Sequence, residues 1–102
     1  GVNGGAPGTV RDLLFLKESL PDGATFTTSG VGRVQLDMNV ASMLLGGHVR
    51  VGFEDNLKYN RERNGVSNAE FVERIVRIAK ELNLEIATPA EARQILGLPE
   101  RK

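Results

Sequence analysis

Residues 46–56 read GGHVRVGFEDN, and the fold can be inferred by working outward from this stretch. The two glycines end a helical pattern over residues 34–45, and residues 48–53 alternate in the manner of a β-strand. The threonine-rich residues 24–29 predict an earlier strand, roughly 24 residues before the second. This separation is too long for a hairpin and fits a helical crossover, so we expect the two strands to be parallel.

Three further helices are predicted from their end signals. Thr9 is expected to cap the first, which stops at a Pro-Asp-Gly turn at residues 21–23. Capping boxes predict two more helices, because Ser67 and Thr88 are each followed three residues later by a glutamate. The last helix is short: it has a proline in its first turn and is expected to end at residue 96, before a glycine.

The helix after Ser67 has the pattern of a helix packed on one face, because its apolar residues recur at steps of three and four. The apolar face is expected to consist of Phe71, Val72, Ile75, Val76, Ile78, Ala79 and Leu82. The opposite, solvated side is expected to carry Arg74, Arg77, Lys80 and Glu81.

The element order predicts an α/β fold with a parallel sheet and covering helices. Residues 1–5 are expected to be the tail of an earlier strand and its loop, and residues 84–87 one more short extended piece. About three βα units do not close a barrel, and a small parallel sheet leaves bare edges. We therefore expect residues 1–102 to be the carboxyl-terminal segment of one larger domain, with no second domain.

Composition narrows the classes of partner. Thirteen basic side chains balance thirteen acidic ones, so no net charge would draw the chain to nucleic acid or to an anionic membrane. No apolar run approaches the roughly 18 residues of a membrane span, and the absence of cysteine excludes disulfides and thiolate chemistry. The chain begins with Gly1 rather than Met, and we expect a processed product, a tag remnant or a fragment.

The strand at residues 48–53 has one unusual face. Its apolar face is formed by Val49, Val51 and Phe53, whereas the other carries His48, Arg50, Gly52 and Glu54. A buried parallel strand is normally apolar on both faces. Asp55 follows at the carboxyl end, the edge at which open α/β sheets and (β/α)₈ barrels bind ligands. Charges in such a place must be paired, solvated or bound to a metal.

The residues alone leave two interpretations of this cluster open. Arg50 could form a purely structural ion pair with Glu54 or Asp55, or the three could belong to a site. His48 is expected to be a hydrogen-bonded core residue rather than a ligand. A zinc site needs three or four protein ligands, so if Glu54 binds zinc the other ligands must come from elsewhere.

Two other features carry weaker signals. The four glycines of residues 1–8 could cradle a phosphate, although they match no phosphate-binding motif and a plain loop is favoured. Arg33 lies at a helix start, where it could bind a carboxylate or phosphate or simply be solvated. Lys58, Arg61 and Arg63 alternate with acidic residues and asparagines, and we expect a solvated loop.

The stretch GGHVRVGFEDN, together with SNA at residues 67–69 and ATPAEAR at residues 87–93, resembles the β-keto acid cleavage enzyme family. The best-known type of this family cleaves 3-keto-5-aminohexanoate in lysine fermentation. The resemblance covers nearly the whole chain, from the loop after the sixth barrel strand onward. Phe53 stands where the family usually has leucine, an apolar exchange that should not affect the chemistry.

The resemblance implies a (β/α)₈ (TIM) barrel that condenses a β-keto acid with acetyl-CoA to give acetoacetate and a new acyl-CoA. It implies a zinc ion held by Glu54 and a histidine pair from an early strand, with Asp55 as general base, oriented by Arg50. His48 does not match the family's metal histidines. It is expected either to be structural or to contact the metal-binding residues without binding the metal itself. The substrate-binding residues and the particular keto acid stay unknown.

The resemblance also has consequences for assembly. We expect a cytoplasmic homo-oligomer that needs a missing amino-terminal barrel portion or a companion chain, because the early strands are absent. The alternative is a non-catalytic αβ module in which Arg50, Glu54 and Asp55 are only structural. Another barrel enzyme, such as a sugar-phosphate isomerase, would share the fold but not explain the run of residues 54–56.

Overall fold

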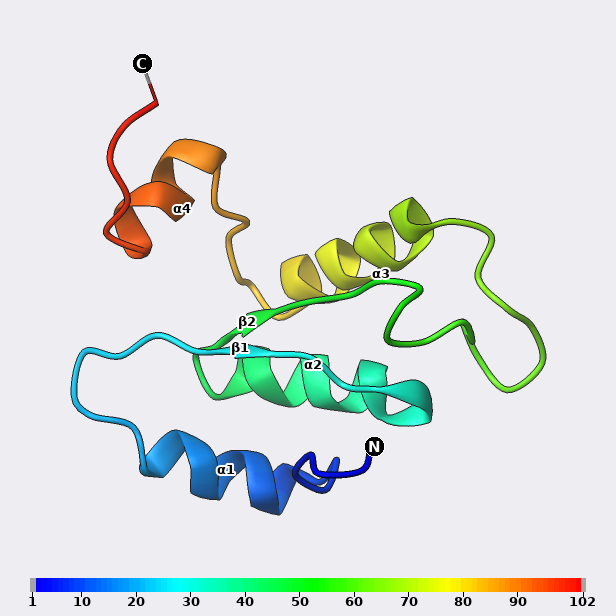
Figure 1. Cartoon of the computed structure of the whole chain (residues 1–102). Coiled ribbons are helices and arrows are strands. Elements are labelled where there is room, and N and C mark those ends of the chain that lie inside the picture. Colours follow the sequence, from blue (N-terminus) through cyan, green and yellow to red (C-terminus); the bar gives the residue numbers. More distant parts are fainter. Residues whose placement is uncertain (1, 102) are drawn as a thin grey trace.

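A computed structural model describes residues 2–101 as a small α/β arrangement (Figure 1). The elements in chain order are helix α1 (Val10–Glu18), strand β1 (Thr27–Thr28), the 3₁₀ helix η1 (Gly32–Val34), helix α2 (Gln35–Leu44), strand β2 (His48–Val49), helix α3 (Asn68–Glu81) and helix α4 (Pro89–Ile95). The element order is therefore the predicted alternation of helices and strands.

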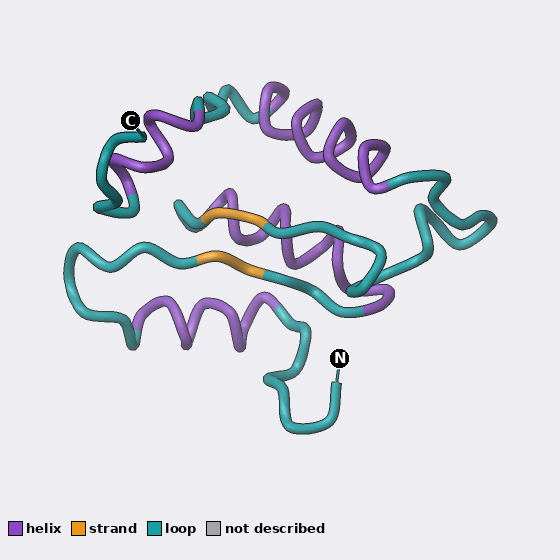
Figure 2. Tube along the Cα trace, turned by 45° about the horizontal axis from the view of Figure 1, so that its top comes forward, coloured by secondary structure: helices purple, strands orange, loops and turns teal. Residues whose placement is uncertain are grey.

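The two strands are parallel, as predicted, with Thr27 opposite His48 and Thr28 opposite Val49. The His48 N–H donates to the Phe26 carbonyl at 2.8 Å, and the Arg50 N–H donates to the Thr28 carbonyl at 3.0 Å. The crossover between them is η1 and α2, which lie on one side of the strand pair (Figure 2). The parallel pair brings the two strand ends to the same edge.

The strands are shorter than predicted, because each has only one neighbour within the described residues. The second strand also ends in a turn rather than running to residue 53, since the N–H groups of Asp55 and Asn56 both donate to the Gly52 carbonyl at 3.1 Å. Residues 84–87 form no strand. Residues 2–5 form a turn closed by the Gly5 N–H on the Val2 carbonyl, not a strand tail, and Gly1 lies outside the described residues.

The apolar core lies between α2, α3 and β2. Met43, Ile75 and Ala79 form its buried centre, and Val49 and Val51 pack against it from the strand, as the predicted apolar face requires. Phe53 continues this face. Its ring meets the fully buried Phe71 ring edge-on, with centroids 5.6 Å apart.

The helix ends follow the sequence closely. Thr9, Ser67 and Thr88 each accept a hydrogen bond from the backbone N–H three residues on. At Thr88 the capping box is complete, because the Glu91 carboxylate also accepts from the Thr88 N–H at 2.7 Å. At Ser67 only half of it forms, because the Glu70 side chain turns to the N–H of Val66 instead.

Two predictions for α3 are wrong. Arg74, expected in solvent, is 8% exposed, because the loop after β2 folds over it and the Tyr59 carbonyl accepts its hydrogen bond. Val72, expected on the apolar face, is half exposed.

The two outer helices differ in their contacts. Helix α1 lies against α2, whereas α4 stands apart and contacts no other element of residues 2–101 (Figure 1). No helix in this part of the chain is long and apolar enough to cross a membrane.

Candidate functional site

The predicted polar cluster lies where the chain leaves β1 and β2. The Gly32 N–H donates to the Asp55 carbonyl at 2.7 Å and so joins the two loops that follow the strands. Behind them, the fully buried Asn39 of α2 donates from Nδ2 to the carbonyls of Thr28, at 3.1 Å, and Arg50, at 3.2 Å. The helix thus fixes how the ends of the two strands lie beside each other.

Arg50 brings the predicted site residues together. Its Nε and Nη2 each lie 3.1 Å from one carboxylate oxygen of Asp55, which is a two-pronged ion pair. The same Nη2 lies 3.0 Å from Oε1 of Glu54. Arg50, Glu54 and Asp55 therefore form one cluster, as the sequence predicted.

The two carboxylates of the cluster have different surroundings. The Asp55 side chain is only 9% exposed, and its Oδ2 also accepts a hydrogen bond from Ser29 Oγ at 2.9 Å. The Glu54 side chain is 62% exposed. Asp55 is therefore held in one orientation by Arg50 and Ser29, whereas Glu54 is open to a further partner.

The backbone turn sets the position of Glu54. Glu54 does not continue the strand face, as the sequence had suggested, but lies in the turn after Gly52 with its carboxylate folded back. A Cβ added at Gly52 would lie 2.5 Å from Glu54 Oε2. A side chain at residue 52 would therefore displace the Glu54 carboxylate from this position.

Ser29 and Asn39 were not predicted as site residues. Ser29 ends the threonine-rich strand segment and Asn39 lies within a helix pattern, so only the register of the two strands reveals their contacts. His48 is exposed and is not the core residue expected from the sequence, because no layer covers that face of the strand among residues 2–101. Its carbonyl accepts from Ser42 Oγ at 2.7 Å.

The described residues do not make a zinc site on their own. Residues 2–101 contain no group of three or more histidine, cysteine, aspartate or glutamate side chains arranged to hold a metal. Glu54 has the donor chemistry and the exposure of a single ligand, but two or three further donors would be needed.

A second ion pair lies at the start of α3. Arg63, expected in a solvated loop, pairs with Glu70 and stacks over the Tyr59 ring at 4.1 Å. The hydrogen bond from Arg63, helped by that from the Val66 N–H, holds the pKa of Glu70 below its usual range. The same hydrogen bond raises the pKa of Arg63. This pair fastens the loop to the helix and takes no part in the Arg50 cluster.

The parallel strands, the covering helix and a polar cluster at the carboxyl edge are typical of α/β proteins, a class in which ligands bind at the carboxyl ends of the strands. The family model of the beta-keto acid cleavage enzyme matches residues 1–98. The chain belongs to the β-keto acid cleavage enzyme family.

Individual relatives agree with this. The chain is 57% identical over 90 residues to the 3-keto-5-aminohexanoate cleavage enzyme of Fusobacterium nucleatum, a match covering 88% of this chain and 33% of that protein. It is 51% identical over 98 residues to the enzyme of the same name from Acetoanaerobium sticklandii, covering 96% of this chain and 36% of the relative. It is 43% identical over 84 residues to the 3-oxoadipate:acetyl-CoA acetyltransferase of Cupriavidus necator, a match covering 82% of this chain and 29% of that protein. The chain thus spans about a third of the length of the curated relatives it matches.

Proposed function

We propose that this chain forms the carboxyl-terminal part of a (β/α)₈-barrel enzyme that condenses a β-keto acid with acetyl-CoA. The products are acetoacetate and a new acyl-CoA. In this proposal Asp55 is the general base, Arg50 orients it, and Glu54 is one ligand of a zinc ion. By the complete enzyme we mean this chain together with the remainder of the family's length, in the same polypeptide or as a companion chain.

The proposal rests on the hydrogen bonds and the ion pair that hold the Asp55 carboxylate in one orientation. Two guanidinium nitrogens and the Ser29 hydroxyl hold its carboxylate at the carboxyl end of parallel strands, the edge used by ligands in such folds. A base must be fixed within hydrogen-bond reach of the proton that it removes. The family membership and the acetyl-CoA in the name of the Cupriavidus necator relative support the choice of reaction.

The chemistry asked of Asp55 is the movement of one proton. The most acidic carbon of a β-keto acid lies between its keto and carboxylate groups, and removal of a proton from it gives a carbanion that would attack the acetyl-CoA carbonyl and expel the CoA thiolate. Addition of this thiolate to the original keto carbon would then break the bond from that carbon to the deprotonated one. This releases the new acyl-CoA and the acetoacetate carbanion, which takes a proton back. Asp55 would take this proton, and Arg50 would keep the carboxylate aimed while the charge on it changes. Binding of the substrate itself requires residues beyond those described.

Formation of the two products tests the proposal directly. The complete enzyme is mixed with acetyl-CoA and a panel of β-keto acids, and acetoacetate and new acyl-CoA are followed by mass spectrometry. Equal amounts of the two products from at least one keto acid are the expected result. Absence of both products from a folded, metal-loaded enzyme across the panel would overturn the proposal.

The role of Glu54 has its own test. Glu54→Gln in the complete enzyme should lower zinc affinity by about 10- to 100-fold or more, because a charged ligand is lost. Glu62→Gln, in the exposed loop after β2, is the matched control, since the Glu62 side chain makes no contact with the cluster. The alternative, a purely structural cluster in a non-catalytic module, predicts altered stability for Glu54→Gln alone and unchanged zinc binding for both variants.

A further inference from the structure

A cavity lies beside the Arg50 cluster, and none of Arg50, Glu54 and Asp55 lines it. This cavity of about 660 Å³ lies between the start of α2, the loop after β2 and one face of α3. Its lining includes Arg33, Lys58, Asn60, Arg61, Arg74 and Asp37. We call it the basic cavity.

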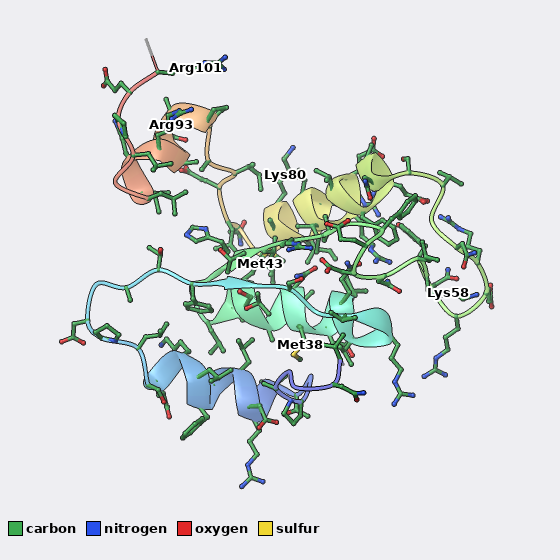
Figure 3. All side chains as sticks on the ribbon, viewed as in Figure 1. Met38, Met43, Lys58, Lys80, Arg93 and Arg101 are labelled. Carbon is green, nitrogen blue, oxygen red and sulfur yellow. The ribbon has the colours of Figure 1, made fainter. Side chains whose placement is uncertain are left out.

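The charge of the basic cavity is one-sided. Four cationic side chains line it, whereas Asp37 is its single carboxylate. Arg33, Lys58 and Arg61 are exposed and make no ion pair with any residue in the range 2–101. Lys58 extends from the loop into solvent beyond the body of the molecule (Figure 3). Because like charges repel, such a cluster without counter-ions favours an anionic ligand.

Arg74 makes this a built site rather than a group of surface charges. Its side chain is 8% exposed, and its guanidinium carbon lies 4.1 Å from the centre of the Tyr59 ring and 5.4 Å from that of Phe71. It donates a hydrogen bond to the Tyr59 carbonyl, but its Nε is buried without a partner. A guanidinium stays charged even when buried, so this wall of the cavity keeps a fixed positive charge.

The basic cavity is coupled to the candidate catalytic site through Asn56. This residue lines the cavity and directly follows Asp55 in the chain. Its Nδ2 donates to the Lys58 carbonyl at 2.6 Å and to Gln35 Oε1 at 3.4 Å, and its Oδ1 accepts from the Lys58 N–H at 3.0 Å. A ligand in the cavity would therefore lie next to the reaction but not on the Arg50 cluster.

We propose that the basic cavity binds the phosphate-bearing end of the CoA thioester, that is, its pyrophosphate and nucleotide 3′-phosphate. A β-keto acid with one carboxylate would leave most of this positive charge unmatched, whereas a CoA carries several phosphate charges. The identification of the ligand as CoA rests on the proposed function, whereas the preference for phosphate rests on the cavity alone.

The first test measures binding without catalysis. Calorimetry of the complete enzyme uses two probes, adenosine 3′,5′-bisphosphate and inorganic pyrophosphate. Arg33→Ala and Arg61→Ala should each weaken bisphosphate binding by about tenfold, because each removes a charge-assisted contact, and binding should fall as salt rises. Arg11→Ala, an exposed arginine on α1, is the matched control and should bind as the unchanged enzyme does.

The second test measures KM for two thioesters. With acetyl-CoA, Arg33→Ala and Arg61→Ala should raise KM about tenfold at nearly constant kcat. With acetyl-pantetheine, which lacks these phosphates, the variants should match the unchanged enzyme.

The outcomes separate this proposal from the proposed function. Acetoacetate formation with no effect of either arginine on bisphosphate binding or on KM would overturn the phosphate site and leave the reaction standing. Bisphosphate binding that depends on the two arginines in an enzyme without the reaction would uphold the site as a phosphate site and refute the reaction. CoA would be refuted as the ligand if pyrophosphate and adenosine 3′,5′-bisphosphate bound with equal affinity and the KM of the two arginine variants for acetyl-CoA were unchanged.

Discussion

Helices α3 and α4 begin with the same N-cap motif but differ in how they are packed. Ser67 and Thr88 each cap the first turn, and each is followed three residues later by a glutamate. Yet α3 buries Phe71 against the rings of Phe53 and Tyr59, and Ile75 in the core with Met43 of α2. Helix α4, in contrast, buries no residue and contacts no other element of residues 2–101. Local signals start a helix, but its partner face is supplied by distant parts of the chain.

The exposed side of α4 has the composition of a contact surface. Ile95 is 45% exposed, and Leu96 and Leu98, which follow it, are 58% and 50% exposed. Apolar side chains of this kind contribute to stability only when they are covered. The comparison with α3 therefore predicts that the same kind of substitution will have unequal effects in the two helices.

The largest difference is expected for apolar truncation. Phe71→Ala should lower the free energy of unfolding by about 3–5 kcal/mol, because it empties a fully buried site beside Phe53. Leu96→Ala should change it by less than about 0.5 kcal/mol. Denaturant unfolding of the two variants measures both. A loss at Leu96 as large as that at Phe71 would mean that α4 is covered and would break the comparison.

A smaller difference is expected for buried polar groups. Asn39→Ala should lower the free energy of unfolding by about 1–3 kcal/mol, because the Arg50 carbonyl loses the hydrogen bond from Asn39 and the Thr28 carbonyl keeps only the one from the Arg50 N–H. Gln94→Ala, an exposed change on α4, is the control and should be nearly neutral. Thermal unfolding of the two variants measures both effects. If Asn39→Ala left the free energy of unfolding unchanged, Asn39 would not fix the strand ends as described.

The N-cap residues of α3 and α4 allow the same substitution to be compared in the two helices. Ser67→Ala and Thr88→Ala each remove one side-chain hydrogen bond to the helix start, worth about 1 kcal/mol. The loss at Ser67 should appear in global unfolding, since α3 belongs to the core. The loss at Thr88 should appear only as faster hydrogen exchange within α4. Equal global effects would show that the two helices unfold together.

The smallest effect concerns acid stability. Because the hydrogen bond from Arg63 lowers the pKa of Glu70, this carboxylate stabilises the fold above its ordinary pKa, and the contribution is lost as pH falls through the lowered value. Glu70→Gln should therefore flatten the acid limb of a plot of unfolding temperature against pH. Glu73→Gln, also on α3, is the matched control. If the acid limb of Glu70→Gln were the same as that of the unchanged protein, the stabilising role of the Arg63–Glu70 pair would be refuted.

Much of the fold could be predicted because its signals are local. The caps at Thr9, Ser67 and Thr88 and the positive φ of 85° at Gly46 mark helix ends that neighbouring residues alone determine. The strand lengths could not be predicted, because a strand persists only where a neighbour pairs with it. The burial of Arg74 could not be predicted either, because a loop fifteen residues earlier covers it.

The candidate site divides in the same way. Arg50, Glu54 and Asp55 are close in sequence, so their proximity was expected from one short stretch. Ser29 reaches Asp55 across 26 residues, and only the parallel register of β1 and β2 brings them together. The basic cavity likewise draws on separate segments. From the sequence, therefore, Arg61 and Arg74 are expected in solvent, whereas Arg33 could either bind a carboxylate or phosphate or be solvated.

In the proposed function, Asp55 is a base and not only the partner of an ion pair. The most direct test is kcat of the complete enzyme carrying Asp55→Asn, a change that keeps the shape of the side chain and removes its ability to take a proton. We predict a loss of about 10²- to 10⁴-fold in kcat, with zinc content and the folded fraction unchanged. A variant that is less stable but forms acetoacetate at the original rate would refute this role of Asp55 and make the Arg50 cluster structural.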